Sequence, residues 1–393
     1  MIHINCDQGK PGKPITWQAG RLLFGILPAT LLAMAFLSSC ATAPHAKQPI
    51  VWPMPPEQPR IAYVRSYHGE TDFKKTNILN TLIGKKNLYF DFGKPYGVAA
   101  SDGRIYVTDT QDGIVWVMDS KTKKVSFLGA GGEGKLATPA GVAVTAGGRV
   151  FVSDASLKRI FCFNPHGRLV MALGYKGEFK IPAGLAINNK LHRLYVVDSF
   201  GHDVHVFDDR TGKHLFTFGK RGVGNGQFNY PTNAAIDKRN GDLYVVDTQN
   251  FRVEAFTPDG KFIRKFGQLG DRPGMFSRPK GIAVDNEGHI YVADAAFNNF
   301  QIFNSKGHVL LFIGGGGATP GFFEEPAGMY MDAKDRLYAV DVFNHRVQVF
   351  QFLSKAWRLA HAAKFKEYTM LKPAPKKSAP KKAAVPVKSR KKS

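Results

Sequence analysis

The sequence predicts an all-β protein that folds as a six-bladed β-propeller. One observation is a repeat of 44 to 49 residues, marked by an aspartate at the end of an apolar run. A large apolar side chain follows each aspartate by nine residues, and a proline opens each repeat. Repeats of this length with four short strands are typical of propeller blades, in which each sheet buries both faces against its neighbours. The marker aspartates are Asp109, Asp154, Asp198, Asp247, Asp294 and Asp341; the apolar residues are Met118, Phe163, Phe207, Phe256, Phe303 and Phe350; the prolines are Pro95, Pro139, Pro182, Pro231, Pro279 and Pro326.

The clearest copy of the repeat spans residues 279–314. Apolar or β-branched runs at 279–285, 290–294, 301–303 and 308–314 are separated by clusters of Gly, Asn and Asp. Such runs predict four strands of an antiparallel meander, joined by tight turns and one longer loop.

The sixth repeat lacks its last strand. The first five repeats each end in a glycine, whereas His361 stands at that position in the sixth. The sequence of residues 60–67 is typical of a single strand. We therefore expect this N-terminal strand to complete the last blade of a propeller spanning residues 60–353 and to remove its open edge. The five glycines are Gly129, Gly174, Gly219, Gly267 and Gly314.

The repeat resembles the NHL family. It combines Pro-x-Gly-apolar-Ala, Tyr-Val-x-Asp, an Asn/Arg loop, apolar-Phe and Phe-Gly before a glycine-rich connection, over residues 94–353. One full connection runs from Phe218-Gly219 to Pro231. With the leader Trp52-Pro53, the chain is similar to bacterial NHL-repeat lipoproteins with a six-bladed propeller.

The N-terminal 59 residues predict export and lipid anchoring. Residues 1–39 combine a basic segment, an apolar run at 22–37 and small residues, as a signal peptide does. Leu37-Ser38-Ser39-Cys40 resembles the bacterial lipoprotein box, which implies lipidation of Cys40. The alanine after it implies an outer-membrane lipoprotein of the cell envelope, facing the periplasm or the cell surface. Residues 40–59 are rich in proline and predict an extended tether. The alternative is an uncleaved signal anchor with a buried cysteine.

Cysteine usage predicts no disulfide. Removal of Cys6 and acylation of Cys40 leave Cys162 without a partner. Cys162 lies in an apolar strand, which favours a small core side chain over a reactive thiol.

The basic charge is concentrated at the C-terminus. The formal net charge of the 393 residues is +23, and residues 354–393 carry 13 basic residues and one acidic residue. Residues 354–371 predict a short helix. Residues 372–393 hold nine Lys/Arg among Pro and Ala, which predicts a disordered basic tail.

One face of the propeller is the candidate binding surface. The residues after the opening prolines should ring one mouth of the axial channel, and the loops after the marker aspartates should lie on the same face. Arg252 and Arg346 occupy the family's Asn/Arg loop, where a bracing role is the stronger interpretation. The candidate rim residues are Tyr96, Arg159, His202, Thr232, Asn233, Arg252, Lys280, Phe297, Phe343 and Arg346.

These observations favour a non-catalytic, monomeric scaffold that binds a protein or an envelope polymer. No catalytic, cofactor-binding or metal-binding residue is predicted, since no histidine falls in a predicted channel-lining strand and the marker aspartates fit turn caps better than a metal ring. One alternative is a lyase or lactonase with an axial metal. A second alternative is that the basic tail binds polyanions, such as nucleic acid or anionic envelope polymers. Because the tail has no aromatic residue to stack on bases, any binding of nucleic acid would not depend on its sequence.

Overall fold

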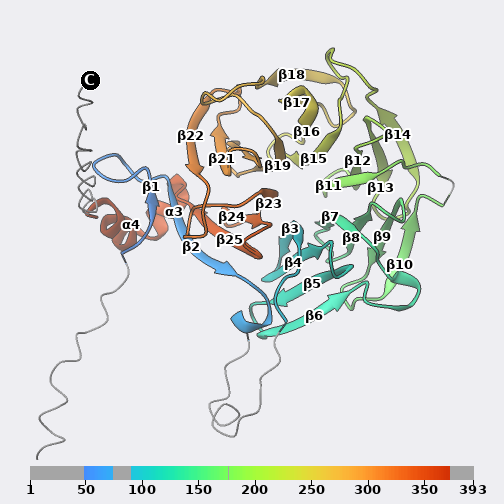
Figure 1. The fold of residues 1–393 in the computed structure, drawn as a ribbon, viewed down its shortest axis with the longest axis horizontal. Coiled ribbons are helices and arrows are strands. Elements are labelled where there is room, and N and C mark those ends of the chain that lie inside the picture. The colour runs from blue at the N-terminus through green and yellow to red at the C-terminus, as the bar shows by residue number, and fades with distance from the viewer. Residues whose placement is uncertain (1–47, 74–89, 176, 372–393) are drawn as a thin grey trace, which may run out of the picture. The chain divides into compact units, whose positions relative to one another are not determined.

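Six antiparallel sheets surround a central axis in the computed structural model, in the order in which they follow one another along the chain (Figure 1). The structure describes residues 48–73, 90–175 and 177–371, and those from Pro49 onward belong to one compact unit. The predicted signal peptide, Cys40 and the basic tail lie outside these residues, as does a helix or loop insertion expected at 77–86. The predicted six-bladed, all-β architecture is confirmed.

Blades 1 to 5 are four-stranded, with strands paired in chain order. Blade 1 holds β3 (Pro95–Ser101), β4 (Arg104–Asp109), β5 (Ile114–Asp119) and β6 (Lys124–Leu128). Blade 2 holds β7 (Pro139–Val144), β8 (Val150–Asp154), β9 (Arg159–Phe163) and β10 (Leu169–Leu173). Blade 3 holds β11 (Pro182–Asn188), β12 (Arg193–Asp198), β13 (Asp203–Asp208) and β14 (His214–Phe218). Blade 4 holds β15 (Pro231–Ile236), β16 (Leu243–Asp247), β17 (Arg252–Phe256) and β18 (Phe262–Phe266). Blade 5 holds β19 (Pro279–Val284), β20 (Ile290–Asp294), β21 (Asn299–Phe303) and β22 (Val309–Gly314).

Blade 6 is closed by the N-terminal strand, as predicted. β23 (Pro326–Met331), β24 (Arg336–Asp341) and β25 (Arg346–Phe352) are followed in the sheet by β2 (Ile61–Tyr67) and β1 (Val51–Trp52). β2 pairs antiparallel with β25, with Ile61 opposite Phe352 and an irregularity between Tyr63 and Arg65. The short fifth strand, β1, was not predicted. It lies within residues 40–59, where an extended tether was expected, and its Val51 is buried and paired with Ala62, so the tether prediction is wrong for this part of the segment.

Within a blade, the second and third strands are the most buried. In blade 4, for example, β16 and β17 are buried along their whole length, whereas the inner strand β15 is partly exposed at several positions. The outer strands β18 and β22 alternate between exposed and covered positions. Three short 3-10 helices lie in loops, at Glu70–Asp72, Gly132–Gly134 and Thr248–Asn250.

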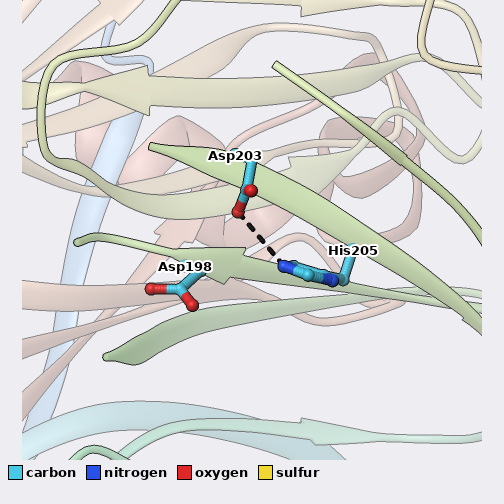
Figure 2. Close-up of side chains that lie close together, drawn as sticks. All are labelled: Asp198, Asp203 and His205. Carbon is cyan, nitrogen blue, oxygen red and sulfur yellow. Dashed lines mark ion pairs between the residues drawn. The ribbon is translucent and has the colours of Figure 1, made fainter. Parts of the chain in front are cut away.

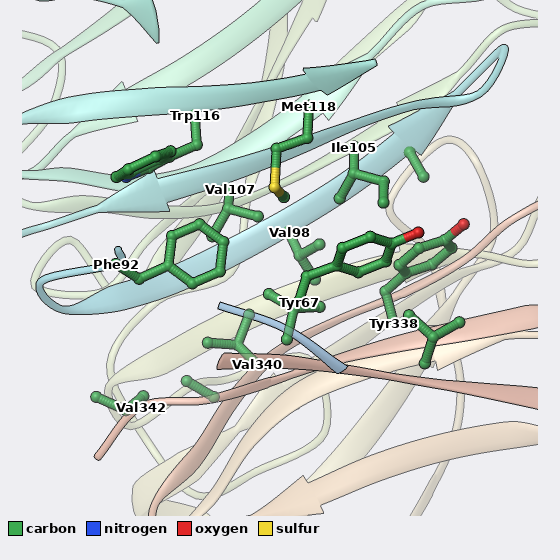
Figure 3. Packing of buried hydrophobic residues seen from close by; sticks show 14 of the residues in the cluster. Tyr67, Phe92, Val98, Ile105, Val107, Trp116, Met118, Tyr338, Val340 and Val342 are labelled. Atoms are coloured by element: carbon green, nitrogen blue, oxygen red, sulfur yellow. The ribbon is translucent and has the colours of Figure 1, made fainter. Parts of the chain in front are cut away.

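A hydrophobic cluster joins blade 6, blade 1 and the N-terminal strand. Tyr67 of β2 belongs to one buried cluster with Val98 and Trp116 of blade 1 and Tyr338 of blade 6 (Figure 3). The cluster therefore fills the place where the two ends of the propeller meet.

The inner strands approach one another closely because glycine follows the opening Pro-x pair. A Cβ atom on Gly97 would lie 2.3 Å from the carbonyl oxygen of Ala140 in the next blade, and one on Gly281 would lie 2.0 Å from that of Ala327. Blade 4 has Asn233 at this position, and its side-chain amide lies against Gly184 of blade 3. The repeated glycine thus sets the width of the channel.

The marker aspartates are fully buried hydrogen-bond acceptors. Asp294 accepts hydrogen bonds from the backbone N–H groups of Ser277 (2.7 Å) and Arg278 (3.1 Å), which precede the inner strand of the same blade. All six marker aspartates make this type of contact, in agreement with the turn-cap interpretation.

Two of the candidate rim residues, Arg252 and Arg346, are buried, which agrees with the bracing interpretation and excludes them from the exposed rim. The Nε atom of Arg252 donates to Asp247 (2.9 Å) and that of Arg346 donates to Asp341 (2.7 Å). Each guanidinium also donates to carbonyl oxygens of the connecting loop, because a buried charge must be paired and hydrogen-bonded. These arginines brace the blades.

Glu254 adds a second buried carboxylate beside Arg252. Its Oε1 atom lies 3.2 Å from the guanidinium but accepts no well-directed hydrogen bond, and its Oε2 accepts one from the Gly226 N–H. Blades 5 and 6 carry Gln301 and Gln348 here, and each amide accepts the equivalent glycine N–H. Burial raises the pKa of Glu254 from 4.5 to about 7.

Cys162 is buried in β9, and burial raises the pKa of its thiol to about 11. This supports the core interpretation over the reactive one.

Two short helices follow β25, namely α3 (Lys355–Ala360) and α4 (Ala362–Thr369), separated at His361. Tyr368 packs with Val51 of β1 and Leu353, so α4 covers the outer edge of blade 6. The helices found in the described part of the chain are too short and too polar to cross a membrane.

The N-terminal strand should be essential for the whole propeller. Deletion of residues 60–69 should lower the melting temperature of the whole domain, because it opens blade 6. Ile61→Ala should reduce the free energy of unfolding by about 2–5 kcal/mol, since Ile61 is buried. Val64→Ala is the matched control, because Val64 is exposed at the irregularity. Unchanged thermal unfolding after the deletion would contradict this role.

Glu254→Gln should remove a pH dependence of stability. An acid whose pKa is higher in the folded state binds more protons there, so wild-type stability should fall as the pH rises from 4.5 to about 7. The variant should be more stable at pH 8 by up to roughly 3 kcal/mol and equal near pH 4.5. Denaturant unfolding of wild type and variant between pH 4.5 and pH 8 measures this difference in the free energy of unfolding. The reciprocal Gln348→Glu variant should acquire the same dependence; two parallel curves for wild type and Glu254→Gln would disprove the effect.

Candidate functional site: the rim face and the axial channel

The loops at one end of the blades form what we call the rim face. Because the strands of each blade are antiparallel, the loops between second and third strands and the connections between blades lie at the same end. Backbone hydrogen bonds join these two sets of loops, as between Phe343 and Glu324 (3.1 Å). The inner strands begin at this end, so the rim face surrounds one mouth of the channel.

The channel brings four predicted residues together. Tyr96, Thr232, Asn233 and Lys280 line a central cavity of about 110 Å³. Such a volume holds several water molecules or a small polar group. The Thr232 hydroxyl lies 2.8 Å from that of Thr248 and donates to the Lys280 carbonyl oxygen (3.1 Å).

Lys280 is held in an ion pair at this mouth. Its Nζ lies 2.6 Å from Glu325 Oε1, and 5.7 Å from the ring centroid of Tyr96. Burial opposes ionisation of Glu325, but the hydrogen bond and charge of Lys280 and the charge of Arg278 bring its pKa below the ordinary value. Burial and, second, the Glu325 charge raise the pKa of Tyr96. The mouth is thus polar with paired charges.

The opposite end of the channel carries a second lysine. Lys238 Nζ donates to the Met331 carbonyl oxygen (3.2 Å) and lies 5.7 Å from the ring centroid of Tyr330. Burial lowers the pKa of Lys238 and raises that of Tyr330 to about 12. Among the described residues that line the channel, none is His, Cys, Asp or Glu.

The remaining predicted residues divide into exposed and buried ones. Phe343 is half exposed on the rim face, Phe297 is partly covered there, and the Arg159 guanidinium lies 4.2 Å from the ring centroid of Tyr175. His202, by contrast, is buried, so its prediction as an accessible rim residue is wrong. Its Nδ1 accepts the N–H of Tyr230 (3.1 Å), and the ring packs edge-on against that tyrosine, because this loop turns inward there.

Sequence reasoning missed an apolar surface on the rim face. Phe200 is 54% exposed and packs edge-on against Tyr230. Phe200 and Phe343 each stand two residues after a marker aspartate, and this fixed offset could have identified them. The exposed large apolar residues of these loops and connections in the described part of the chain are Phe90, Leu157, Tyr175, Phe200, Val223, Leu269, Phe322 and Phe343.

The opposite face differs in character. In the described hairpin turns between first and second strands and between third and fourth strands, Leu191 is the only large apolar residue that is exposed. Apolar exposure at the loops is therefore concentrated on one face, around a polar channel mouth.

Two family models match parts of the chain. A model described as a 6-bladed beta-propeller matches residues 178–255, and the NHL repeat model matches residues 276–303. A curated relative, Protein brain tumor of Drosophila melanogaster, is 29% identical over 114 residues, which is 29% of this chain. The match spans only 10% of that protein.

Solved structures share the fold at low identity. A gluconolactonase from Xanthomonas campestris aligns with a TM-score of 0.53 and 17% identity, over 74% of this chain and 98% of that one. A streptogramin B lyase aligns with a TM-score of 0.52 and 12% identity, over 68% and 96%. An auxiliary nutrient binding protein from Bacteroides thetaiotaomicron aligns with a TM-score of 0.52 and 14% identity, over 67% and 70%. With the six blades of the structure, these matches identify the fold as a six-bladed β-propeller and residues 276–303 as an NHL repeat.

Proposed function

We propose that this propeller is a non-catalytic scaffold that binds a protein partner across its rim face. The observation that carries the proposal is the concentration of exposed apolar loop residues on this face. Exposed apolar side chains grouped on one face of a soluble domain are typical of interaction surfaces. Aromatic residues such as Phe200 and Phe343 can serve as anchors, since a few buried aromatic contacts supply most of the binding free energy of an interface.

The polar channel mouth complements these anchors. Tyr96, Asn233 and the Lys280–Glu325 pair lie inside the apolar loops. Because the charges at the mouth are paired, they would orient a polar partner through directed contacts. They would not strongly attract partners of one charge sign.

The alternative is an enzyme with an axial metal, as in lyase or lactonase propellers. The lining of the channel argues against it, because its side chains offer tyrosine, threonine, asparagine and lysine instead of the imidazole or carboxylate ligands that divalent metals prefer. The lyase and lactonase structures are too distant in sequence to support more than a common fold.

The scaffold would act at the cell envelope, tethered through Cys40. This part of the proposal is supported by the signal-peptide pattern and the group Leu37-Ser38-Ser39-Cys40. The residues between Cys40 and Pro49, where the compact unit begins, would connect the propeller to the lipid anchor.

A crosslinking experiment tests the rim face. A photo-crosslinking amino acid at position 200 or 343 should yield a specific protein adduct in the expressing cells, whereas one at position 191 should not. Phe200→Ser and Phe343→Ser, made in an otherwise native chain carrying a crosslinker at 297, should each lower adduct yield by about 10-fold or more, since anchor residues are worth at least about 1–2 kcal/mol.

Leu191→Ser is the matched control, because it removes an exposed apolar side chain from the opposite face. All three variants should keep the wild-type melting temperature. Equal adduct yields from positions 191, 200 and 343 would refute binding through the rim face.

Replacement of Cys40 tests the anchor. Cys40→Ala should abolish incorporation of a labelled fatty acid and should move the protein from the membrane fraction to a soluble or unprocessed form. Cys6→Ala is the matched control and should leave labelling unchanged. Labelling that persists in Cys40→Ala would exclude this residue as the lipid attachment site.

A further inference from the structure

Blade 3 departs from blades 4 and 6 at the position of the buried arginine. Five residues after the marker aspartate, blade 4 carries Arg252 and blade 6 carries Arg346, whereas blade 3 carries Asp203. A second carboxylate thus stands where two other blades place a cation against the buried marker. Two neighbouring negative charges repel each other, and a positive charge between them removes the repulsion.

Asp203 and the marker Asp198 share this space with His205. The Asp203 carboxylate points toward the His205 ring on the same strand, and Asp198 lies at the end of the adjacent strand (Figure 2). The distance from Asp203 Oδ1 to His205 Nε2 is 3.2 Å. One ligand atom from each of the three residues lies within 4.8 Å of the others.

Two carboxylate oxygens remain available for a cation. Asp203 Oδ1 is buried and accepts no well-directed hydrogen bond. Asp198 Oδ1 accepts the N–H groups of Ile181 and Gly201, but its Oδ2 accepts one N–H, that of Lys180. Since a carboxylate oxygen has two lone pairs, Oδ2 retains one.

His205 is oriented as a metal ligand would be. Its Nδ1 lies 3.2 Å from the Thr217 hydroxyl, which lies 2.9 Å from His214 Nε2. If Nδ1 donates to Thr217 and the hydroxyl donates to His214, then His205 Nε2 presents a lone pair toward the two aspartates. The buried ring of Phe179 packs edge-on against the imidazole and fixes its position. Ligand histidines are held by such outer hydrogen bonds.

We propose that Asp198, Asp203 and His205 bind a divalent first-row transition-metal ion of the Zn²⁺ class. The ion takes the electrostatic place of the arginine in blades 4 and 6. One imidazole with two carboxylates suits such ions, whereas Mg²⁺ and Ca²⁺ prefer all-oxygen sites. The ion would fix the loop that carries Phe200, because Gly201 of this loop donates to Asp198. The site lies on the side of a blade, away from the channel lining, and binding of the ion can be measured without the proposed partner.

Zn²⁺ titration of the metal-stripped, tag-free full chain tests the site. Calorimetry should show one equivalent bound by the wild type, with a rise in melting temperature that depends on Zn²⁺ concentration. Asp203→Asn and His205→Gln should each weaken binding by about 100-fold or more, and Thr217→Val should weaken it by about 10-fold or more. His308→Gln is the matched control, because His308 lies in an outer turn of blade 5, and should bind as the wild type does.

Asp203→Arg provides the second test. It places the arginine of blades 4 and 6 beside Asp198, so it should abolish Zn²⁺ binding, although the shorter connection of blade 3 offers the guanidinium fewer carbonyl oxygens. If Asp203→Arg does not fold, the near-isosteric Asp203→Asn still tests whether Asp203 binds the ion. Circular dichroism checks that this variant is folded. Absence of a Zn²⁺ equivalent in the wild type, or wild-type affinity in Asp203→Asn and His205→Gln, would overturn the proposal.

Discussion

The hydrogen bonds from backbone N–H groups to the six buried marker aspartates organise the rim end of the propeller. Each carboxylate at the end of a second strand ties down the segment that enters the inner strand of the same blade, as Asp109 does with Gly93 and Lys94. A buried carboxylate without donors would be strongly unfavourable, so the entering segment has little freedom. The position of the channel mouth and the direction of the rim loops follow from this constraint.

The blades differ in the groups that compensate the negative charge of the buried marker aspartate. Blade 5 uses backbone and loop N–H groups, whereas blades 4 and 6 add a buried arginine that also gathers the carbonyl oxygens of a long glycine-rich connection. In blade 3 the connection is shorter, and Asp203 and His205 replace the arginine and its acid or amide neighbour. These two residues lie beside the fully buried carboxylate of Asp198, so their change of charge must be compensated locally, unlike a change in an exposed loop.

The same rigidity leaves the rim loops free to vary. Because the marker carboxylates and the inner glycines define each blade, the residues two or three positions after the marker can point into solvent without affecting the core. Phe200 and Phe343 use this freedom, and together with the connection residues they make the rim face apolar. The channel between the inner strands is narrow, since glycines such as Gly281 leave no room for a side chain. A partner would therefore contact the mouth and the surrounding loops instead of entering deeply.

The sequence by itself determined the number of blades, the strand order and the closure by residues 60–67, because the repeat period, the turn residues and the missing sixth glycine are all local features. It also predicted Tyr96, Thr232, Asn233 and Lys280 at one mouth, since a constant offset from the opening proline places them on equivalent strands. Burial was decided only by the tertiary structure. Whether Arg252, Arg346 and His202 face solvent depends on whether a connecting loop folds over them, and spacing contains no such information. The pairing of Lys280 with Glu325, and the meeting of Asp198, Asp203 and His205, likewise depend on side chains brought together across strands and blades.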